Sequence, residues 1–391
     1  MTLRRICYIF TAYCEVIILW IHEQPNWTQF TWDLETLSSH LADIRYRQGR
    51  LFGRMVSLGF DLKQEAKLKM LTDDVLSSSS IEGEVLNPIE VRSSIARRLH
   101  LDIAGMVPTA HYIDGVVEMM LDATQFYKEP ITAERLYGWH AALFPTGRSS
   151  MHRITVGQWR TPETGTMQVI SGAMGREKIH YEAPAATRLE HEMDMFITWC
   201  TAEQRIDPVL LAGIAHFWFV TIHPFEDGNG RIARALGDLF LARADGSPER
   251  FYSLSRQIEA NRNTYYATLE TQQRGTSDIT LWLDWFLNCL DLSLTHSETA
   301  LSSILFKSHL WDILNATGVN ERQRLVINRM LEEGFKGFMN TSKYAKMAKC
   351  SNDTALRDIQ DLKARRVFLQ NAGGGRSTSY RLTVTIPDSG L

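Results

Sequence analysis

The chain has 391 residues, 44% of them hydrophobic and 22% charged, and a formal net charge of −3. This composition is ordinary for a soluble globular protein, and the length favours two or three domains over a single core. The small net charge excludes an overall attraction to nucleic acid or to anionic membranes. The five cysteines are scattered without a CxxC pair. They therefore exclude a disulfide framework and favour a reducing, cytoplasmic setting.

An apolar run near the N-terminus, from Ile6 to Ile21, follows Arg4 and Arg5 and resembles a signal peptide or anchor. The run is 16 residues long and carries Glu15 in its middle. A bilayer-spanning helix needs roughly 20 apolar residues, and no small-residue cleavage site follows the run. We therefore expect no membrane association. We interpret residues 1–21 as an extension, present because the start codon has been assigned too far upstream. The folded protein is expected to begin between Trp20 and Trp27.

Residues 22–105 predict an N-terminal helical domain. Apolar residues recur mostly at three- and four-residue steps from Trp32 to Ile44, and the pattern repeats from Leu62 to Val75. This spacing places them on one face of a helix.

Residues 106–300 predict a second, mainly helical domain. Glycines and prolines between Arg153 and Pro184 separate two short β-prone runs, 167–170 and 178–181, which predict a hairpin. Thr132 and Asp207 precede two of the helices as suitable N-caps. The predicted helices cover residues 112–126, 133–143, 186–200, 208–220, 232–244, 261–271 and 279–294.

Residues 319–391 predict a winged helix-turn-helix domain. Two short helices, 341–348 and 353–365, precede β-prone runs at 367–370 and 379–384, with a glycine turn between these runs. Between residues 341 and 382 there are nine basic and three acidic residues. Such a surface suits either DNA phosphates or a protein partner, and the sequence leaves both open. The basic residues expected on the second helix and the wing are Arg357, Lys363, Arg365, Arg366 and Arg376.

The segment from His223 to Arg234 reads HPFEDGNGRIAR and joins two predicted helices. Gly228, Asn229 and Gly230 can all adopt positive φ, which predicts consecutive backbone N–H groups converging on an anion. The N-terminus of the following helix also favours phosphate. Arg231 and Arg234 are three residues apart, so they share one helix face and can hold further phosphate oxygens.

Two further residues of this segment supply chemistry. Asp227 is a hard oxygen ligand, suited to holding Mg²⁺ against a polyphosphate. His223 has a side chain that can act as a base near pH 7. A calcium loop fits poorly because Arg231 stands where an oxygen ligand is needed, and a purely structural turn does not explain all of these positions together. The segment therefore predicts attack on a bound phosphate, with His223 deprotonating the nucleophile.

These twelve residues resemble the complete signature of the Fic family, HPFx[D/E]GNGRxxR. The resemblance implies a mainly α fold, with a helical core and a small β-hairpin called the flap. It also implies a protein adenylyltransferase, an enzyme that transfers AMP from Mg-ATP to a Ser, Thr or Tyr hydroxyl of a target protein or of itself. ATP, Mg²⁺ and the target protein are thus the expected substrate, ion and partner.

The resemblance assigns a role to each matching position. His223 would be the general base, Phe225 would anchor the loop in the core, and Asp227 would bind Mg²⁺. Gly228, Asn229 and Gly230 would cradle the phosphates, with Arg231 and Arg234 holding the outer ones. The flap, which would align the target backbone by β-pairing, is expected at Val169, Ile170, Ser171 and Gly172. Tyr265, next to Tyr266, resembles residues near the adenine pocket.

A second motif, Ser78-Ser79-Ser80-Ile81-Glu82-Gly83, resembles the inhibitory motif [S/T]xxxE[G/N] of the family. The resemblance implies that Glu82 pairs with Arg234 and prevents productive binding of the γ-phosphate. A carboxylate and a phosphate cannot share one guanidinium face. A closed form favoured by about 2.7 kcal/mol would leave roughly 1% of molecules open. Alone, a serine run before a glutamate is also typical of a helix start. Glu84 is a neighbouring candidate, but the spacing favours Glu82.

Two other functions compete with this hypothesis. One is a DNA-binding regulator in which the central domain only senses nucleotide. The other keeps the Fic fold but removes AMP, or transfers a different phosphate-containing group. Inhibitory helices of this kind are often linked to dimerisation in similar proteins, so a homodimer is a further expected partner.

Overall fold

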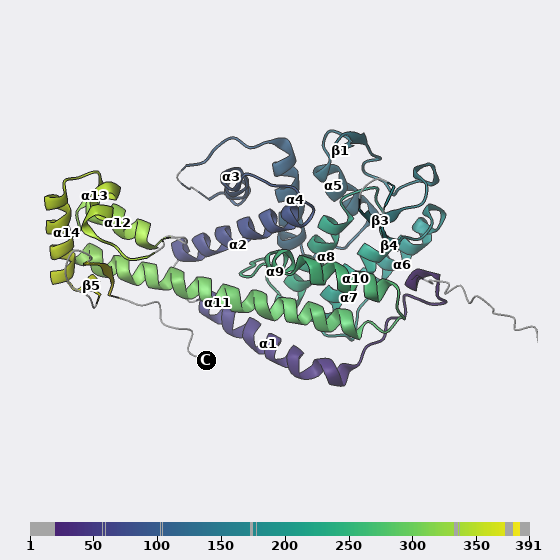
Figure 1. Ribbon diagram of the computed structural model, residues 1–391. Coiled ribbons are helices and arrows are strands. Elements are labelled where there is room, and N and C mark those ends of the chain that lie inside the picture. The colour runs from purple at the N-terminus through teal and green to yellow at the C-terminus, as the bar shows by residue number, and fades with distance from the viewer. Residues whose placement is uncertain are drawn as a thin grey trace, which may run out of the picture. The chain divides into compact units, whose positions relative to one another are not determined.

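The computed structural model describes residues 20–56, 58, 60–101, 103, 105–172, 175–176, 178–331, 335, 337–371 and 378–383 (Figure 1). These residues are mainly helical, with small antiparallel strand pairs. They divide into two compact units. The first unit holds the described residues up to Gly53 together with Lys67–Leu294, and the second holds Arg54–Ala66 and the residues from Thr295 onward.

The elements of the first unit follow one another with two short strand pairs near the middle of the chain. Its 3₁₀ helices are η1 (Ile21–Glu23), η2 (Pro162–Thr164) and η3 (Ala186–Arg188). The strands are β1 (Arg148–Ser149), β2 (His152–Arg153), β3 (Gln168–Ser171) and β4 (Lys178–Glu182). Three helices, α1 (Leu34–Val56), α2 (Phe60–Ile81) and α11 (Thr280–Thr317), extend across the division between the units. The remaining helices are α3 (Pro88–Arg98), α4 (His111–Gln125), α5 (Ala133–Leu143), α6 (Leu189–Thr201), α7 (Pro208–Ile222), α8 (Asn229–Asp245), α9 (Leu254–Ala260) and α10 (Arg262–Gln273).

Helices α7 and α8 form the centre of this unit, and Figure 1 shows α10 and α6 beside them. Every residue of α7 from Ala212 to Ile222 is buried, which explains its uninterrupted apolar sequence. Gly213 allows close packing, because a Cβ there would come within 2.9 Å of Leu283 on α11. The Trp282 indole donates to the Gly213 carbonyl at 2.8 Å. Helices α4 and α5 pack against α8 from another side.

The predicted N-caps are confirmed. The Thr132 hydroxyl accepts a hydrogen bond from the Arg135 N–H at 3.2 Å, at the start of α5. The Asp207 carboxylate accepts from the Val209 N–H at 2.8 Å, ahead of α7. In both cases a short oxygen-bearing side chain satisfies one of the amides that the first turn leaves free.

The predicted hairpin is also confirmed, as the antiparallel pair β3–β4. Its register shifts between Val169 and Ile170. The buried Tyr181 fixes the hairpin to the end of α7, because its hydroxyl donates to the Thr221 carbonyl at 2.7 Å. The hairpin therefore lies beside the loop that follows α7.

Two predicted helix boundaries are wrong. The helix expected to end at residue 294 continues to Thr317, because polar residues blur its apolar pattern while Gly318, with φ of 69°, is the first strong breaker. Helix α8 begins at Asn229, three residues before the predicted start at Ile232. Its first residues were read as part of the loop.

The second unit has its own apolar core, which includes Leu314, Tyr344, Ile359 and Phe368. Its later elements are α12 (Glu321–Leu331), α13 (Thr341–Ala348), α14 (Asn352–Ala364), β5 (Phe368–Gln370) and β6 (Tyr380–Leu382). Helix α12 was not predicted from the sequence. The predicted glycine turn lies outside the described residues, and so does Arg376. The other basic residues expected on a binding face are exposed, namely Arg357, Lys363, Arg365 and Arg366.

The apolar run 6–21 lies almost entirely outside the described residues. Among the helices that are described, none combines the length and the apolarity needed to cross a membrane.

Candidate active site

The segment from His223 to Gly228 forms a tight loop between α7 and α8. His223 ends α7 in the left-handed region, with φ of 53°. Gly228 precedes α8 with φ of 82°, and a Cβ there would meet the Phe144 ring at 2.9 Å. Only glycine combines this backbone conformation with this close approach at little cost.

The loop is closed by hydrogen bonds of its own. The Asn229 carboxamide accepts from the Phe225 N–H at 3.0 Å and donates to the Phe225 carbonyl at 2.8 Å. The Phe225 ring is fully buried and stacks on His140 with ring centroids 4.1 Å apart. This side chain thus fixes the loop to the interior by burial, and the Asn229 amide fixes its shape.

The predicted anion nest is wrong in its backbone conformation. Among Gly228, Asn229 and Gly230, only Gly228 has positive φ, and the other two already belong to the first turn of α8. The Asn229 side chain bonds within the loop, which pulls its backbone into the helix. The groups presented to an anion are therefore the first N–H groups of α8, which have no partner inside the helix.

The His223 imidazole has a defined tautomer. Its Nδ1 lies 3.1 Å from the Val220 carbonyl oxygen, which only accepts, so Nδ1 carries the hydrogen. The lone pair is then on Nε2, the nitrogen of a base. Burial lowers the pKa of His223, so the ring is neutral at pH 7. The Arg160 guanidinium holds the backbone here, donating to the His223 carbonyl at 2.9 Å.

Asp227 lies between the loop and the β1–β2 pair. Its Oδ1 accepts from the Gly228 N–H at 2.6 Å, and its Oδ2 accepts from the Ser149 hydroxyl. The half-buried carboxylate is a hard donor that suits Mg²⁺. In the described part of the chain no cluster of three or more His, Cys, Asp or Glu could hold a metal alone. An ion at Asp227 would therefore take its other ligands from phosphate or water.

Arg234, on the first turns of α8, is buried against the end of α2. Its Nε donates to the Ser78 hydroxyl at 3.0 Å. Its Nη2 donates to the Ser78 carbonyl and to Glu82 Oε1, both at 2.8 Å. Burial alone would lower the pKa of Arg234, but Glu82, Tyr265 and Tyr266 together outweigh it, and the pKa is raised. The structure thus brings Ser78, Glu82 and Arg234 together.

The serine run stands at a helix end, so its alternative interpretation as a helix start is wrong. Helix α2 ends at Ile81, and Gly83 follows with φ of 85°. The Glu84 N–H bonds to the Ser79 carbonyl at 3.0 Å, and the Gly83 N–H bonds to the Ser80 carbonyl at 2.9 Å. These bonds form the common glycine-containing helix termination. Two glutamates at a helix C-terminus oppose the helix dipole, so their partners must stabilise them.

Glu84 is a site residue that the sequence analysis set aside. Its Oε2 lies 2.8 Å from Nη1 of Arg231, whose side chain is 3% exposed. The Gly83 turn aims both glutamates at α8, so each motif arginine has a carboxylate partner. The signal was present in the sequence, as two acids two residues apart and two arginines three apart. The motif spacing pointed only to Glu82.

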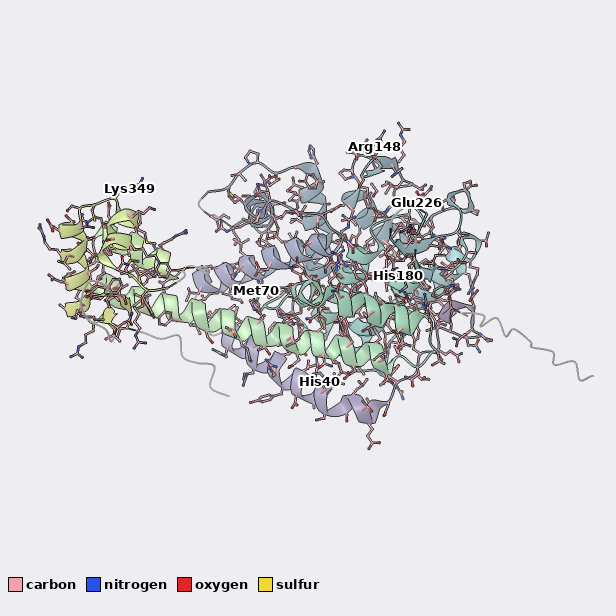
Figure 2. The ribbon with its side chains drawn as sticks, viewed as in Figure 1. His40, Met70, Arg148, His180, Glu226 and Lys349 are labelled. Atoms are coloured by element: carbon pink, nitrogen blue, oxygen red, sulfur yellow. The ribbon has the colours of Figure 1, made fainter. Side chains whose placement is uncertain are left out.

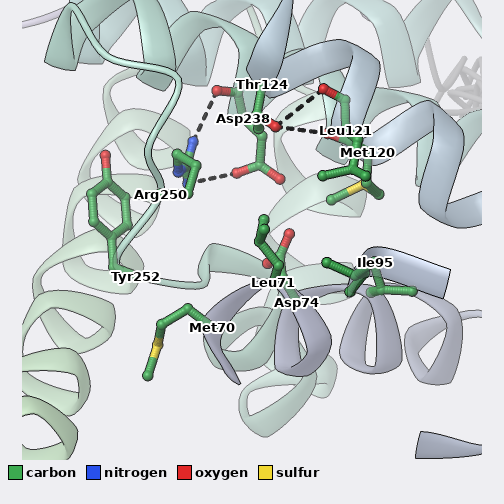
Figure 3. Close-up of a pocket in the computed structure, with 11 residues that line it drawn as sticks. Met70, Leu71, Asp74, Ile95, Met120, Leu121, Thr124, Asp238, Arg250 and Tyr252 are labelled. Carbon is green, nitrogen blue, oxygen red and sulfur yellow. Dashed lines mark hydrogen bonds and ion pairs between the residues drawn. The ribbon is translucent and has the colours of Figure 1, made fainter. Parts of the chain in front are cut away.

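Two buried aspartates, Asp74 on α2 and Asp238 on α8, lie near Arg250 (Figure 3). Asp238 on α8 pairs with Arg250 at 2.7 Å, and Asp74 on α2 accepts from the Ser253 hydroxyl at 2.6 Å. Both aspartates line a cavity of about 10 Å³. Burial, followed by the neighbouring Asp74, raises the pKa of Asp238.

A cavity of about 160 Å³ lies beside the loop, lined by Glu84, Arg231, Phe144 and Ser149 among others. Small-molecule and cofactor sites usually measure about 300–1,000 Å³. With Glu84 in place, this cavity is smaller than a nucleotide site. A Cβ added to Gly230 would come within 2.2 Å of Glu82 Oε1. The Glu82 carboxylate therefore covers the first turn of α8.

The remaining predicted residues lie on two neighbouring elements. Tyr265 on α10 is 1% exposed, and its hydroxyl lies 2.9 Å from His216 Nε2 inside the core. Tyr266 is more exposed and reaches the Ile81 carbonyl at 3.4 Å. The flap residues occupy the outer end of the hairpin, where Gly172 has φ of 109°. They are Val169, Ile170, Ser171 and Gly172.

Comparison with known proteins matches two parts of the chain. Residues 20–101 match a domain of unknown function (DUF4172), and residues 130–241 match the Fic/DOC family. "Protein adenylyltransferase Fic" of Drosophila yakuba is 25% identical over 242 residues, which are 59% of this chain and 42% of that protein. The Drosophila mojavensis protein of the same name is 26% identical with the same coverage. The chain thus spans less than half the length of these relatives.

Two solved structures are also similar. A Fic family protein from Desulfovibrio desulfuricans aligns with a TM-score of 0.46 and 18% identity, over 88% of this chain and 96% of that one. A Fic domain containing signaling protein from Bacteroides thetaiotaomicron aligns with a TM-score of 0.48 and 19% identity, over 65% and 97%. The family match includes the whole loop from His223 to Arg234. The chain therefore carries a Fic/DOC domain over residues 130–241.

Proposed function

We propose that this chain is a protein adenylyltransferase, which transfers AMP from Mg-ATP to a hydroxyl of a target protein or of itself. The observation that carries the proposal is the position of Arg234. It is buried on the first turns of α8, close to the helix N-terminus, and it is held there by a displaceable carboxylate. The distant relatives named protein adenylyltransferase support the same reaction.

The phosphates of ATP would bind at the N-terminus of α8. The N–H groups of Asn229 and Gly230 would receive them, with Arg231 and Arg234 on the outer phosphates. Asp227 would hold Mg²⁺ together with phosphate oxygens, and the ion would neutralise charge on the polyphosphate. Phe225 would keep this surface in place through its buried ring.

His223 would act as the general base. Its Nε2 would take the proton of the target hydroxyl, while the hydroxyl oxygen attacks the α-phosphorus of ATP. The bond to the bridging oxygen then breaks, and pyrophosphate leaves. The Nδ1 hydrogen bond to Val220 would hold the ring in the orientation that this transfer needs. The flap residues at the end of β3 would align the target backbone, and Tyr265 would support the adenine side from within the core.

The segment Ser78–Glu84 would inhibit this reaction. Glu82 occupies Arg234 and Glu84 occupies Arg231, so two carboxylates stand where the outer phosphates would bind. Each arginine can satisfy either its carboxylate or a phosphate, so nucleotide and segment compete. Ser78 adds two hydrogen bonds that hold Arg234 in the closed position.

The second unit would form a winged helix-turn-helix domain. The order of α13, α14, β5 and β6 supports this interpretation. Its exposed basic residues would contact DNA or a protein partner, including a second copy of this chain. Salt-dependent DNA binding that responds to ATP, without any transfer, would instead favour a nucleotide-sensing regulator.

The proposal is tested by measuring the intact mass of the Glu82→Gly variant after incubation with Mg-ATP. We expect a gain of one or more AMP masses, up to about 100-fold faster than in the parent if the closed form is favoured by 2.7 kcal/mol. Adding His223→Ala should lower the rate by about 10²–10⁴-fold, the usual contribution of a general base.

The mass itself separates the alternative reactions. A gain other than AMP would show that another phosphate-containing group is transferred, and loss of AMP from a modified protein would show removal. A Glu82→Gly variant that labels no faster than the parent would contradict the inhibitory role of Glu82.

A further inference from the structure

Three polar side chains on the flap and on α10 form a continuous hydrogen-bonded line. The Ser171 hydroxyl, at the end of β3, lies 2.6 Å from Nε2 of His180 on β4. Nδ1 of the same imidazole lies 2.6 Å from Glu270 Oε2 on α10. A hydroxyl, an imidazole and a carboxylate in this order have the geometry that activates a serine as a nucleophile.

Glu270 also pairs with two cations. Lys178 Nζ lies 3.1 Å and Arg274 Nη2 lies 3.2 Å from Glu270 Oε1. The Glu270 carboxylate only accepts, so Nδ1 of His180 carries a hydrogen, and Nε2 then accepts the Ser171 hydroxyl hydrogen. The hydroxyl proton thus has a base in place.

The Ser171 hydroxyl is not needed to hold the hairpin against α10. The hairpin is already joined to α10 by the Lys178–Glu270 pair and by the Arg274 guanidinium, which donates to the Ile179 carbonyl at 3.0 Å. The Ser171 hydroxyl adds a bond at an exposed position, where it is accessible to an incoming group. Gly172 follows with φ of 109°, a conformation that favours glycine.

The line of side chains lies next to the loop that carries His223. Tyr181 adjoins His180 and donates to the carbonyl of Thr221, two residues before His223, at 2.7 Å. Figure 2 labels His180 and, on the loop, Glu226, both in the first unit. The same hairpin is the element proposed to present target hydroxyls to the site.

We propose that Ser171 is an activated nucleophile and a self-modification site that accepts AMP. This inference rests on the proposed adenylyltransferase function. In the step, the Ser171 oxygen forms a bond to the α-phosphorus of ATP. The bond between that phosphorus and the oxygen bridging to the β-phosphate breaks, and pyrophosphate leaves with its electron pair. The hydroxyl proton passes to His180 Nε2. The product is a phosphodiester on the flap, beside Lys178.

The first arm of the test measures the nucleophile without ATP. The full chain is treated with a fluorophosphonate probe, which phosphonylates activated serines, and the labelled peptides are mapped. We expect Ser171 to react about tenfold or more faster than Ser39, an exposed serine on α1. His180→Gln and Glu270→Gln should slow labelling of Ser171 and leave that of Ser39 unchanged. The hairpin stays in place in both variants through the Arg274 bond to the Ile179 carbonyl and the Tyr181 bond to the Thr221 carbonyl.

The second arm uses the Glu82→Gly variant with Mg-ATP and maps AMP by peptide mass spectrometry. We expect AMP on Ser171, and a loss of about tenfold or more in its rate when His180→Gln is added. Dilution separates the two routes to this product. A rate per molecule that is independent of protein concentration indicates transfer within one chain, and a rate that rises with concentration indicates transfer between copies.

Three results would overturn the inference, and they can be told apart. If AMP appears on other residues while Ser171 stays unmodified, the proposed function holds and the assignment of Ser171 is wrong. If no residue receives AMP, the proposed function fails and self-modification fails with it. Equal fluorophosphonate rates for Ser171 and Ser39 would also overturn the activation of Ser171.

Discussion

The loop that begins at His223 and the segment Ser78–Glu84 meet at Arg234, but they are held in different ways. The loop is fixed from inside, by the fully buried Phe225 ring and by the two hydrogen bonds of Asn229. The segment Ser78–Glu84 spans the end of α2 at Ile81. Its two glutamate side chains are 30% and 45% exposed and reach the arginines through single ion pairs.

The proposed function requires a rigid loop at His223 and a segment Ser78–Glu84 that ATP can displace, and the two kinds of contact suit these two requirements. Burial of an aromatic ring and closed backbone hydrogen bonds are lost only by unfolding the loop. A half-exposed ion pair contributes about 1 kcal/mol or less unless its geometry is favourable, and another anion can replace it. Under the proposed function, the phosphate-binding surface would thus be preformed, and the segment Ser78–Glu84 would be attached to it by exchangeable contacts.

The largest expected effect comes from removing the buried anchor of the loop. Phe225→Ala should lower the free energy of unfolding by about 3–5 kcal/mol, because it leaves a cavity between His140 and Trp159. Urea denaturation of the full chain measures this change. The matched control is Phe126→Ala on the surface, where the ring is 58% exposed and the cost should stay below about 1 kcal/mol. Equal costs would contradict the anchoring role.

Acid should weaken the same region through its buried histidines. Burial lowers the pKa of His140 to about 4 and that of His216 to about 3, whereas both titrate near 6.5 when unfolded. Below pH 6.5 the unfolded chain binds more protons, so stability is complete above that pH and is lost as the pH falls. The expected loss is about 1.4 kcal/mol per pH unit for each histidine.

Urea midpoints at pH 7, 6 and 5 measure this acid dependence. In a His140→Phe variant, the free energy of unfolding should fall less steeply with pH. Between pH 6.5 and 5 its slope should be smaller than that of the parent by about 1.4 kcal/mol per pH unit. An unchanged slope would show that this histidine does not remain neutral in the folded protein.

The closing amide of the loop should have an intermediate effect. Asn229→Ala should cost about 1–3 kcal/mol, because it leaves the Phe225 N–H and carbonyl without partners in a buried site. Asn229→Asp keeps the acceptor for the N–H but places a charged oxygen against the Phe225 carbonyl in a buried site, so it should cost more. Thermal unfolding of the two variants checks this order, and the reverse order would contradict the assigned hydrogen bonds.

The smallest expected effect tests the inhibitory segment. Glu84→Gln should raise the rate of AMP transfer by less than about tenfold, or 1.4 kcal/mol, because Arg234 keeps its contacts with Glu82 and Ser78. Combined with Glu82→Gly, it should raise the rate beyond that of the single variant. Asp353→Asn, at an exposed acid of the second unit, is the control and should leave the rate unchanged. A Glu84→Gln rate equal to the parent rate would limit inhibition to Glu82.

The sequence alone determined the mainly helical fold, the β-hairpin and the N-caps at Thr132 and Asp207. These features depend on periodicity and on residues a few positions apart, where steric and hydrogen-bonding rules act locally. The sequence also singled out the loop His223–Arg234 and the pairing of Glu82 with Arg234, because the two motifs resemble known ones at every defined position.

Only the tertiary structure decided the features that join distant segments. Glu84 meets Arg231 because the Gly83 turn aims a second carboxylate at α8, and Ser171, His180 and Glu270 align across two strands and a helix. Asn229 enters α8 because its amide closes on Phe225, although the sequence predicted a loop with positive φ at this position. Ion pairs and side-chain hydrogen bonds between separate elements depend on how those elements pack, and no local pattern in the chain encodes that packing.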